Sequence, residues 1–186
     1  MGTPLETPRA AITPSVKLRE IGQYVDIALA HVTERPLMVF GSNPPEQAVS
    51  ITGKPKTQDV IVGIVIGGTA TIIVDDIERQ VAAGDIVSLW MSGYNRYDPD
   101  FDAARSRGEA KSWSSAKRDH VPNIGDRLRW LFEAEIPGKG SVPKKVRTCR
   151  LGTNPDTALV LACDALNASA KGVPLETVTD LDPEPF

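Results

Sequence analysis

The chain has 186 residues, a formal net charge of −3, 41% hydrophobic residues and 24% charged residues. This composition is typical of a soluble globular protein and excludes a wholly disordered chain. No apolar run approaches the roughly 20 residues of a membrane span, and Met1–Pro14 lacks the pattern of a signal peptide, so we expect a cytoplasmic protein. Two cysteines and two histidines argue against a disulfide framework, a zinc site and histidine-centred catalysis.

Strand patterns dominate the first half of the chain. Residues 1–15 contain three prolines and no periodicity, which predicts a flexible leader. Gly67-Gly68 separates two apolar runs and is expected to form a hairpin turn. Alternating or continuous β-branched residues predict strands over 24–32 (resuming at 37–40), 59–66, 69–74 (continuing at 77–81), 86–91, 127–135 and 144–151.

The remaining segments differ in character. Residues 92–123 are polar and helical in part, and 155–170 have helical spacing with Leu159, Cys163 and Leu166 on one face. This order predicts a mainly β, OB-fold-like barrel of five or six strands, with a helical insertion between strands 3 and 4 and a C-terminal helix. The predicted parts are a flexible leader (1–15), an OB-fold-like DNA-binding domain (16–152), a short helix (153–171) and a disordered acidic tail (172–186).

Charge is distributed unevenly along the chain. Residues 94–150 hold 13 basic and 8 acidic residues, a net charge of +5, and residues 151–186 hold one basic and 6 acidic residues, a net charge of −5. Such asymmetry indicates binding to nucleic acid or an acidic interaction tail, although ordinary surface scatter also explains part of it.

Aromatic residues lie among these basic residues, a combination that suits single-stranded nucleic acid because rings stack on bases while cations follow the phosphates. Trp90 and Trp113 could instead fill the core, and this alternative stays open. The candidate nucleic-acid-binding residues are Lys54, Lys56, Trp90, Tyr94, Arg96, Tyr97, Arg105, Arg107, Trp113, Lys144 and Lys145.

Motifs for catalysis are absent from the sequence. It contains no GxSxG, no phosphate-binding GxxxxGK[ST], no GxGxxG after a strand and no HExxH, so we expect a non-enzymatic protein without metal or cofactor. Thr69–Trp90 resembles the strand–turn–strand of cupin barrels, but the histidines and glutamate that would bind a metal there are missing.

The C-terminal stretch, ETVTDLDPEPF, is acidic, lacks lysine and arginine, and ends in Pro185-Phe186. It resembles the tail of bacterial and bacteriophage single-stranded DNA-binding proteins, and KPKTQDVIVGIVIGG and GDRLRWLFEAE look like the versions carried by phages of actinobacteria. The resemblance implies that the terminal ring enters an apolar pocket on a replication or recombination protein, with acids meeting basic residues around it. The implied partner-binding residues are Asp180, Asp182, Glu184, Pro185 and Phe186.

The leading hypothesis is therefore a single-stranded DNA-binding protein of a phage that acts in the cytoplasm of a bacterial host, as a monomer or as a homo-oligomer. One alternative is a β-barrel accessory or structural protein that binds a host protein, and a remote one is a degenerate cupin-like barrel. The sequence leaves open the oligomeric state, the site size, the tail's partner and whether RNA or DNA is preferred.

Overall fold

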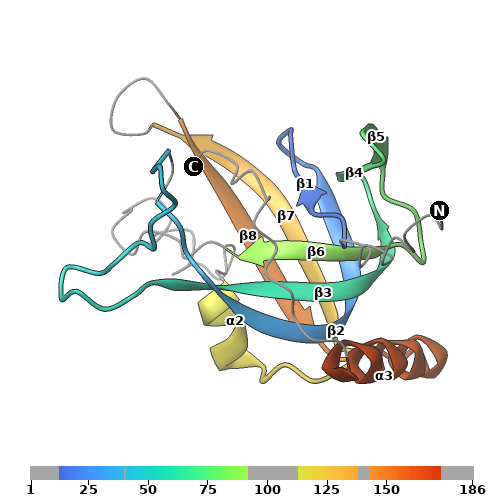
Figure 1. Cartoon of the computed structure of the whole chain (residues 1–186). Helices are drawn as coiled ribbons and strands as arrows, with labels where there is room; N and C mark the ends of the chain where they lie inside the picture. Colours follow the sequence, from blue (N-terminus) through green and yellow to red (C-terminus); the bar gives the residue numbers. More distant parts are fainter. Residues whose placement is uncertain (1–12, 40, 92–112, 138–142, 173–186) are drawn as a thin grey trace, which may run out of the picture.

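The protein is described here by a computed structural model that covers residues 13–39, 41–91, 113–137 and 143–172. Strands hold far more of the described residues than helices do, so the predicted mainly β class is confirmed (Figure 1). The elements are β1 (Val16–Lys17), β2 (Tyr24–Pro36), β3 (Thr57–Gly68), β4 (Thr71–Val74), β5 (Ile77–Gln80), β6 (Ile86–Met91), α2 (Trp113–Asp119), β7 (Arg127–Ile136), β8 (Lys144–Gly152) and α3 (Thr157–Gly172).

The strands form two antiparallel sheets. The larger sheet has the order β6-β3-β2-β7-β8, and the smaller has the order β1-β4-β5. The sheets are not closed into the barrel that we predicted, because no ladder among the described residues joins an edge of one sheet to the other. Among the described residues, the edge strand β6 makes only one isolated bridge toward the segment that leads into the smaller sheet, between Ser88 and Ser15.

Two local predictions change in the structure. Gly67 and Gly68 lie within β3, opposite Asp26 and Val25 of β2, rather than in a hairpin turn. The chain then leaves the larger sheet, and β4 pairs with β1, a strand that we did not predict. Before β1, Pro14 and Ser15 of the expected flexible leader contact Ser88 of β6, and the rest of that leader up to residue 12 lies outside the described residues.

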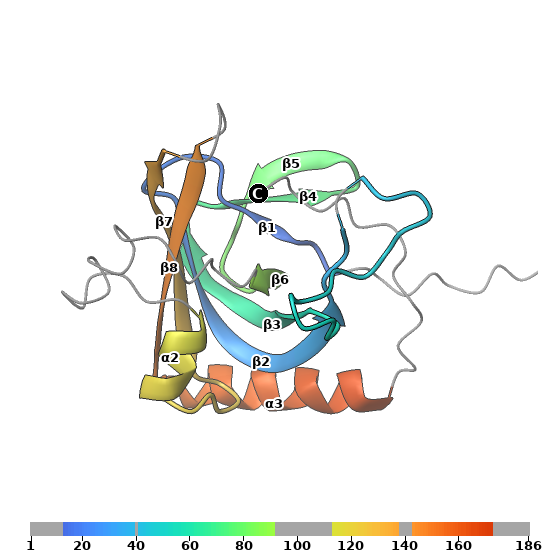
Figure 2. The same cartoon turned by 90° about the vertical axis from the view of Figure 1, so that its left-hand side faces the viewer.

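Curvature of the larger sheet has a local cause. β2 and β3 bend strongly around the core (Figure 2), and their ladder has register shifts at Asp26/Ile27 and Leu29/His31. Bulges of this type bend and twist a strand. Gly63 of β3 also permits the bend, because a Cβ at this position would lie 2.5 Å from the carbonyl oxygen of Ala28.

The main apolar core lies between the concave face of the larger sheet and the smaller sheet. Alternate residues of β2 (Val25, Ile27 and Leu29) point into it, together with Ile72 of β4 and Phe132 of β7. Each such fully buried side chain contributes roughly 1.5–3 kcal/mol to folding. This core fixes which residues of β2, β7 and β8 face the opposite way, which we call the outer face.

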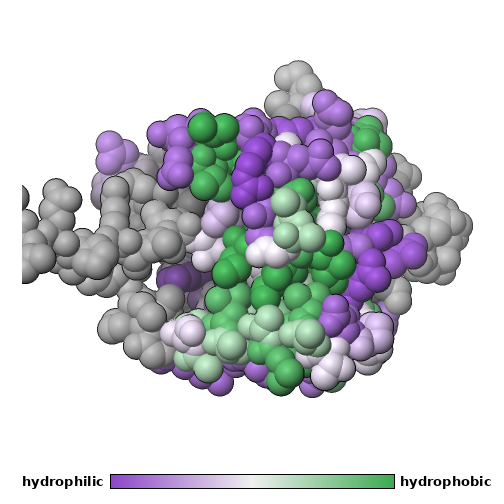
Figure 3. Space-filling model, turned by 90° about the vertical axis from the view of Figure 1, so that its right-hand side faces the viewer, coloured by the Kyte–Doolittle hydropathy of each residue, from purple (hydrophilic) through white to green (hydrophobic). Residues whose placement is uncertain are grey.

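Helix α3 covers one part of the outer face. Cys163 is buried against Ala28 and Ala30 of β2, with Leu159 and Leu166 around it. Asp156 caps the helix by accepting a hydrogen bond from the backbone N–H of Leu159 at 3.1 Å. Apolar side chains gather over the lower part of the side shown in Figure 3, where this helix lies. The predicted C-terminal helix is thereby confirmed.

The predicted helical insertion lies between β6 and β7. Its described part contains α2, whose Trp113 and Ala116 are buried in the main core. Residues 92–112 lie outside the described residues.

Candidate nucleic-acid interface

The predicted lysines stand on two separate parts of the surface. Lys54 and Lys56 are exposed in the segment 37–56, which connects β2 to β3, and Lys145 is exposed on β8. These segments lie at the same end of the molecule in Figure 1 but on opposite sides of it in Figure 2. The side chain of Lys144 is not among those described.

Of the predicted stacking residues, Trp113 has a structural role. Its side chain is 8% exposed, and its Nε1 donates a hydrogen bond to Asp59 Oδ2 at 2.6 Å. Lys117 Nζ lies 2.6 Å from the same oxygen and 5.2 Å from the centroid of the indole ring. A ring held in this way cannot stack on a base, so the core alternative is correct for Trp113. Trp90 on β6 is half-buried.

The other predicted residues lie outside the described residues. They are Tyr94, Arg96, Tyr97, Arg105 and Arg107 in the insertion, and Asp180, Asp182, Glu184, Pro185 and Phe186 in the acidic tail. Their roles stay predictions.

A cluster that sequence reasoning missed surrounds Asp26 on the outer face. Arg129 donates two hydrogen bonds to this carboxylate, at 2.7 and 2.8 Å, and Arg127 donates one at 2.6 Å. The Asp26 side chain is 5% exposed, whereas those of Arg127 and Arg129 are 47% and 46% exposed. The buried carboxylate therefore holds two arginines that still face solvent.

Electrostatics at Asp26 follow from this geometry. Burial alone raises the pKa of the carboxyl group, but the hydrogen bonds and charges of Arg129 and Arg127 outweigh burial and hold its pKa below the usual value. Asp26 in turn raises the pKa of Arg129. With one carboxylate and two guanidinium groups, the cluster carries a formal net charge of +1.

Aromatic and apolar surface adjoins these arginines. The guanidinium carbon of Arg129 lies 4.7 Å from the centroid of the Tyr24 ring, a cation–π contact. Tyr24 is the cross-strand partner of Leu131, and Arg129 is the partner of Arg150. Directly opposite residues share one face of a sheet. Arg150 is exposed and has no ion pair with any described residue.

We call this surface the arginine face. It consists of Tyr24, Asp26, Arg127, Arg129, Leu131 and Arg150, from β2, β7 and β8. Arg129 and Arg150 lie directly opposite each other, and two like charges in this position destabilise a sheet. Asp26 neutralises Arg129 but not Arg150. The surface is therefore suited to an anionic ligand that also offers a flat apolar group.

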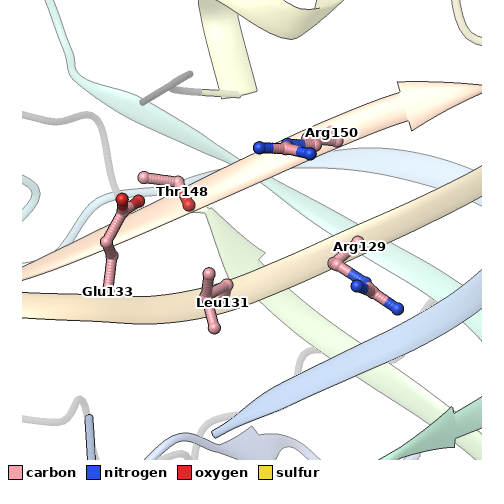
Figure 4. Close-up of a pocket in the computed structure, with 5 residues that line it drawn as sticks. All are labelled: Arg129, Leu131, Glu133, Thr148 and Arg150. Atoms are coloured by element: carbon pink, nitrogen blue, oxygen red, sulfur yellow. The ribbon is translucent and has the colours of Figure 1, made fainter. Parts of the chain in front are cut away.

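A pocket of about 150 Å³ opens beside the arginine face, lined by Arg129, Leu131, Glu133, Thr148 and Arg150. Figure 4 shows Glu133 rising from β7 toward Thr148 of β8, while the guanidinium group of Arg129 points away from it. Glu133 lies at the register shift between Phe132 and Ala134, where the extra residue of a bulge re-aims a side chain. Its Oε2 atom is buried and has no hydrogen-bond partner.

The arginine face has a sequence signal, although a weak one. Arg127 and Arg129 alternate with apolar residues in a predicted strand, and two basic residues at i and i+2 on one side indicate a cationic strip. The buried carboxylate on β2 lies 101 residues from Arg127 in the sequence, so only the fold brings them together.

Comparisons with known proteins give no match: no family model fits the chain, and neither a curated protein nor a solved structure matches it. None of the described helices has the length and apolarity needed to cross a membrane. The described residues also contain no group of three or more His, Cys, Asp or Glu side chains that could hold a metal ion.

Proposed function

We propose that this protein binds single-stranded DNA through the arginine face. The observation that carries the proposal is the set of Arg127, Arg129 and Arg150 next to the Tyr24 ring, with two of the arginines fixed by a buried carboxylate. Fixed guanidinium groups lose little entropy when they contact phosphates. Aromatic rings beside them stack on bases, a contact that a base in a duplex does not offer.

The OB-fold-like assignment belongs to this proposal. It is supported by the curved antiparallel sheet of five strands and by the helical segment between β6 and β7. Lys54, Lys56 and Lys145 are exposed on two separate parts of the surface outside the arginine face, so in this proposal they contact phosphates only where a longer strand continues past that face.

The test is equilibrium binding to oligo-dT and to duplex DNA of equal length across a salt series. We expect tighter binding to the single strand, with the logarithm of affinity falling by roughly 0.7 per phosphate neutralised for each tenfold rise in salt. Affinity for duplex equal to that for oligo-dT, or no binding at low salt, contradicts the proposal.

A second part of the proposal concerns the acidic stretch from Asp180 to Phe186, which we propose recruits a replication or recombination protein. Its support is the sequence alone: acids for steering and an aromatic ring for anchoring. Phe186→Ala should remove a partner from a pull-down with host lysate while leaving oligo-dT affinity unchanged. Identical partners for both proteins contradict recruitment by this stretch.

An interaction protein is the second candidate, favoured by exposed apolar residues in segment 37–56. Ile51 is fully exposed and Val49 is 57% exposed. A partner that binds there would be lost on Ile51→Ser without any change in oligo-dT affinity, which separates this candidate from the first.

A further inference from the structure

The pocket beside the arginine face contains an acidic residue without a partner, Glu133. A site that bound only phosphate would be lined by cations, so this acid needs a separate explanation. Glu133 Oε2 is buried without a partner, and leaving such a group unsatisfied costs free energy because it has lost its hydrogen bonds to water. Unsatisfied buried groups are few in folded proteins and call for an explanation. Because this oxygen is shielded from solvent, a ligand in the pocket reaches it only when the Glu133 side chain turns toward the pocket, and a ligand that then donates hydrogen bonds to it would recover the cost.

Size and lining restrict the ligand. At about 150 Å³ the pocket is smaller than the roughly 300–1,000 Å³ sites that hold complete small-molecule ligands, so it suits one flat group. Leu131 supplies an apolar surface, while Glu133, Thr148 and Arg150 supply one acceptor group, one hydroxyl and one cation. This set resembles what a nucleobase requires: a face to pack on and polar atoms along one edge.

We propose that this pocket is a nucleobase subsite with a preference for guanine, read by Glu133. The inference rests on the proposed binding of single strands. A carboxylate has two acceptor oxygens and no donor. Guanine presents two neighbouring donors on its Watson–Crick edge, the ring N1–H and the exocyclic amino group, so both oxygens are satisfied together.

The other bases fit less well on the same chemistry. Adenine and cytosine each place a ring-nitrogen acceptor next to their amino group, and this acceptor would face the second carboxylate oxygen. Thymine offers a single N3–H between two carbonyl oxygens. Each of these arrangements sets an acceptor against a negatively charged acceptor, which is repulsive. Arg150, at the same pocket, is placed to contact the guanine carbonyl or a neighbouring phosphate.

The experiment measures the affinity of the full chain for an oligo-dT clearly longer than the shortest one that saturates binding, and for the same oligonucleotide with one central dG, dA, dC or deoxyinosine. A dT strand offers every register, so a single guanine can reach the pocket by sliding. We expect dG to bind roughly 5- to 150-fold more tightly than dT, the discrimination typical of one bidentate contact. Deoxyinosine, which lacks the amino group, should lose most of this preference.

Glu133→Gln should abolish the preference for dG and leave dT affinity within about twofold. The matched control is Glu135→Gln, which makes the same change in charge at an exposed position of the same strand and should keep the preference. Melting temperatures of both variants establish that they fold. Equal affinity of the wild-type protein for dG and dT overturns the subsite, and a preference that survives Glu133→Gln overturns the role of Glu133.

A second measurement separates this inference from the proposed function. NMR spectra of the full chain are recorded with guanosine monophosphate and with thymidine monophosphate. Selective shifts at Glu133 and Thr148 with the guanine nucleotide support the pocket even if oligonucleotides do not bind, an outcome that contradicts only the proposed function. The absence of selective shifts together with equal dG and dT affinities overturns the subsite alone.

Discussion

The two ends of the segment 24–30, which is the first half of β2, show how a single outer face is used in two ways. At Ala28 and Ala30, β2 carries small side chains, and α3 packs closely enough that Cys163 Sγ lies 3.4 Å from the carbonyl oxygen of Ala28. At Tyr24 and Asp26, the same strand carries an aromatic ring and a carboxylate, and the surface stays open with arginines on it.

The two stretches differ because small apolar side chains and a buried carboxylate need different neighbours. The small side chains of Ala28 and Ala30 let α3 approach closely, and apolar packing fills the space between the helix and the strand. A buried carboxylate requires donors and charge, so the other end recruits arginines whose heads remain solvated. Burial closes the first end as part of the fold, whereas charge keeps the second end available for a ligand.

The largest effect is expected when the carboxylate at the open end is neutralised. Asp26→Asn removes the charge that holds Arg127 and Arg129, and the free energy of unfolding should fall by about 1.5–3 kcal/mol, the range for hydrogen bonds to charged groups. Urea denaturation measures the loss. Asp75→Asn, at an exposed turn, is the matched control and should change stability by less than about 0.5 kcal/mol.

The comparison of the wild-type protein with Asp26→Asn also gives a test that uses pH. Because the folded pKa of Asp26 is lowered, its contribution to stability is complete above the unfolded pKa of about 3.9 and is lost as pH falls through the folded value. The advantage of wild type over Asp26→Asn should therefore be constant near neutral pH and shrink below about pH 4. An advantage that shrinks well above pH 5 would show that another group causes it.

Overpacking the closed end should have a slightly smaller effect. Ala28→Leu inserts three carbons between β2 and α3 and should cost about 1–3 kcal/mol of stability, with oligo-dT affinity unchanged. Ala158→Leu, the same change at an exposed position of α3, is the control and should be nearly neutral. Loss of DNA affinity in folded Ala28→Leu would mean that the two ends are not independent.

At the open end, Tyr24→Ala should weaken binding to single strands by about 1–3 kcal/mol, since it removes the proposed stacking ring. Tyr24→Phe keeps the ring and should bind nearly as wild type. Fluorescence titration with oligo-dT measures both. Equal losses in the two variants would assign the effect to the hydroxyl group rather than to stacking.

The smallest effect is expected at Arg150, which has no described ion-pair partner to lose. Arg150→Gln removes one of two opposite like charges, so stability should stay the same or rise slightly, and the salt slope of oligo-dT binding should fall by roughly 0.7, equivalent to one phosphate contact. Arg118→Gln makes the same charge change at an exposed residue of α2 that is not part of the arginine face, and it should leave the slope unaltered.

The sequence predicts the strands well because their β-branched alternation is a local property. β3, β6, β7, β8 and α3 lie where the pattern placed them, within a few residues. Pairing partners are not local. Gly67-Gly68 looks like a turn in the sequence, yet it pairs with β2, and the two-residue strand β1 is too short to show a pattern.

Sites are predicted less well for a related reason. A tryptophan among basic residues fits both a stacking platform and a core residue, and only the fold shows that Trp113 is fastened to Asp59. The arginine face depends on three strands and on Asp26, whose environment no neighbouring residue reveals. Glu133 depends on a bulge that is visible only in the register of β7 and β8.

The position of Asp59 determines where new sequence could be inserted into this chain. It is the cross-strand partner of Met91, where β6 ends, and it accepts the hydrogen bond of Trp113, where α2 begins. The chain therefore leaves and rejoins the framework at a single residue. A foreign peptide inserted between Met91 and Trp113 would have to bridge only the short distance between two residues that both contact Asp59, and each doubling of the length of a flexible insert costs only about 0.6 kcal/mol. New sequence could therefore be inserted at this position while the two sheets keep their register.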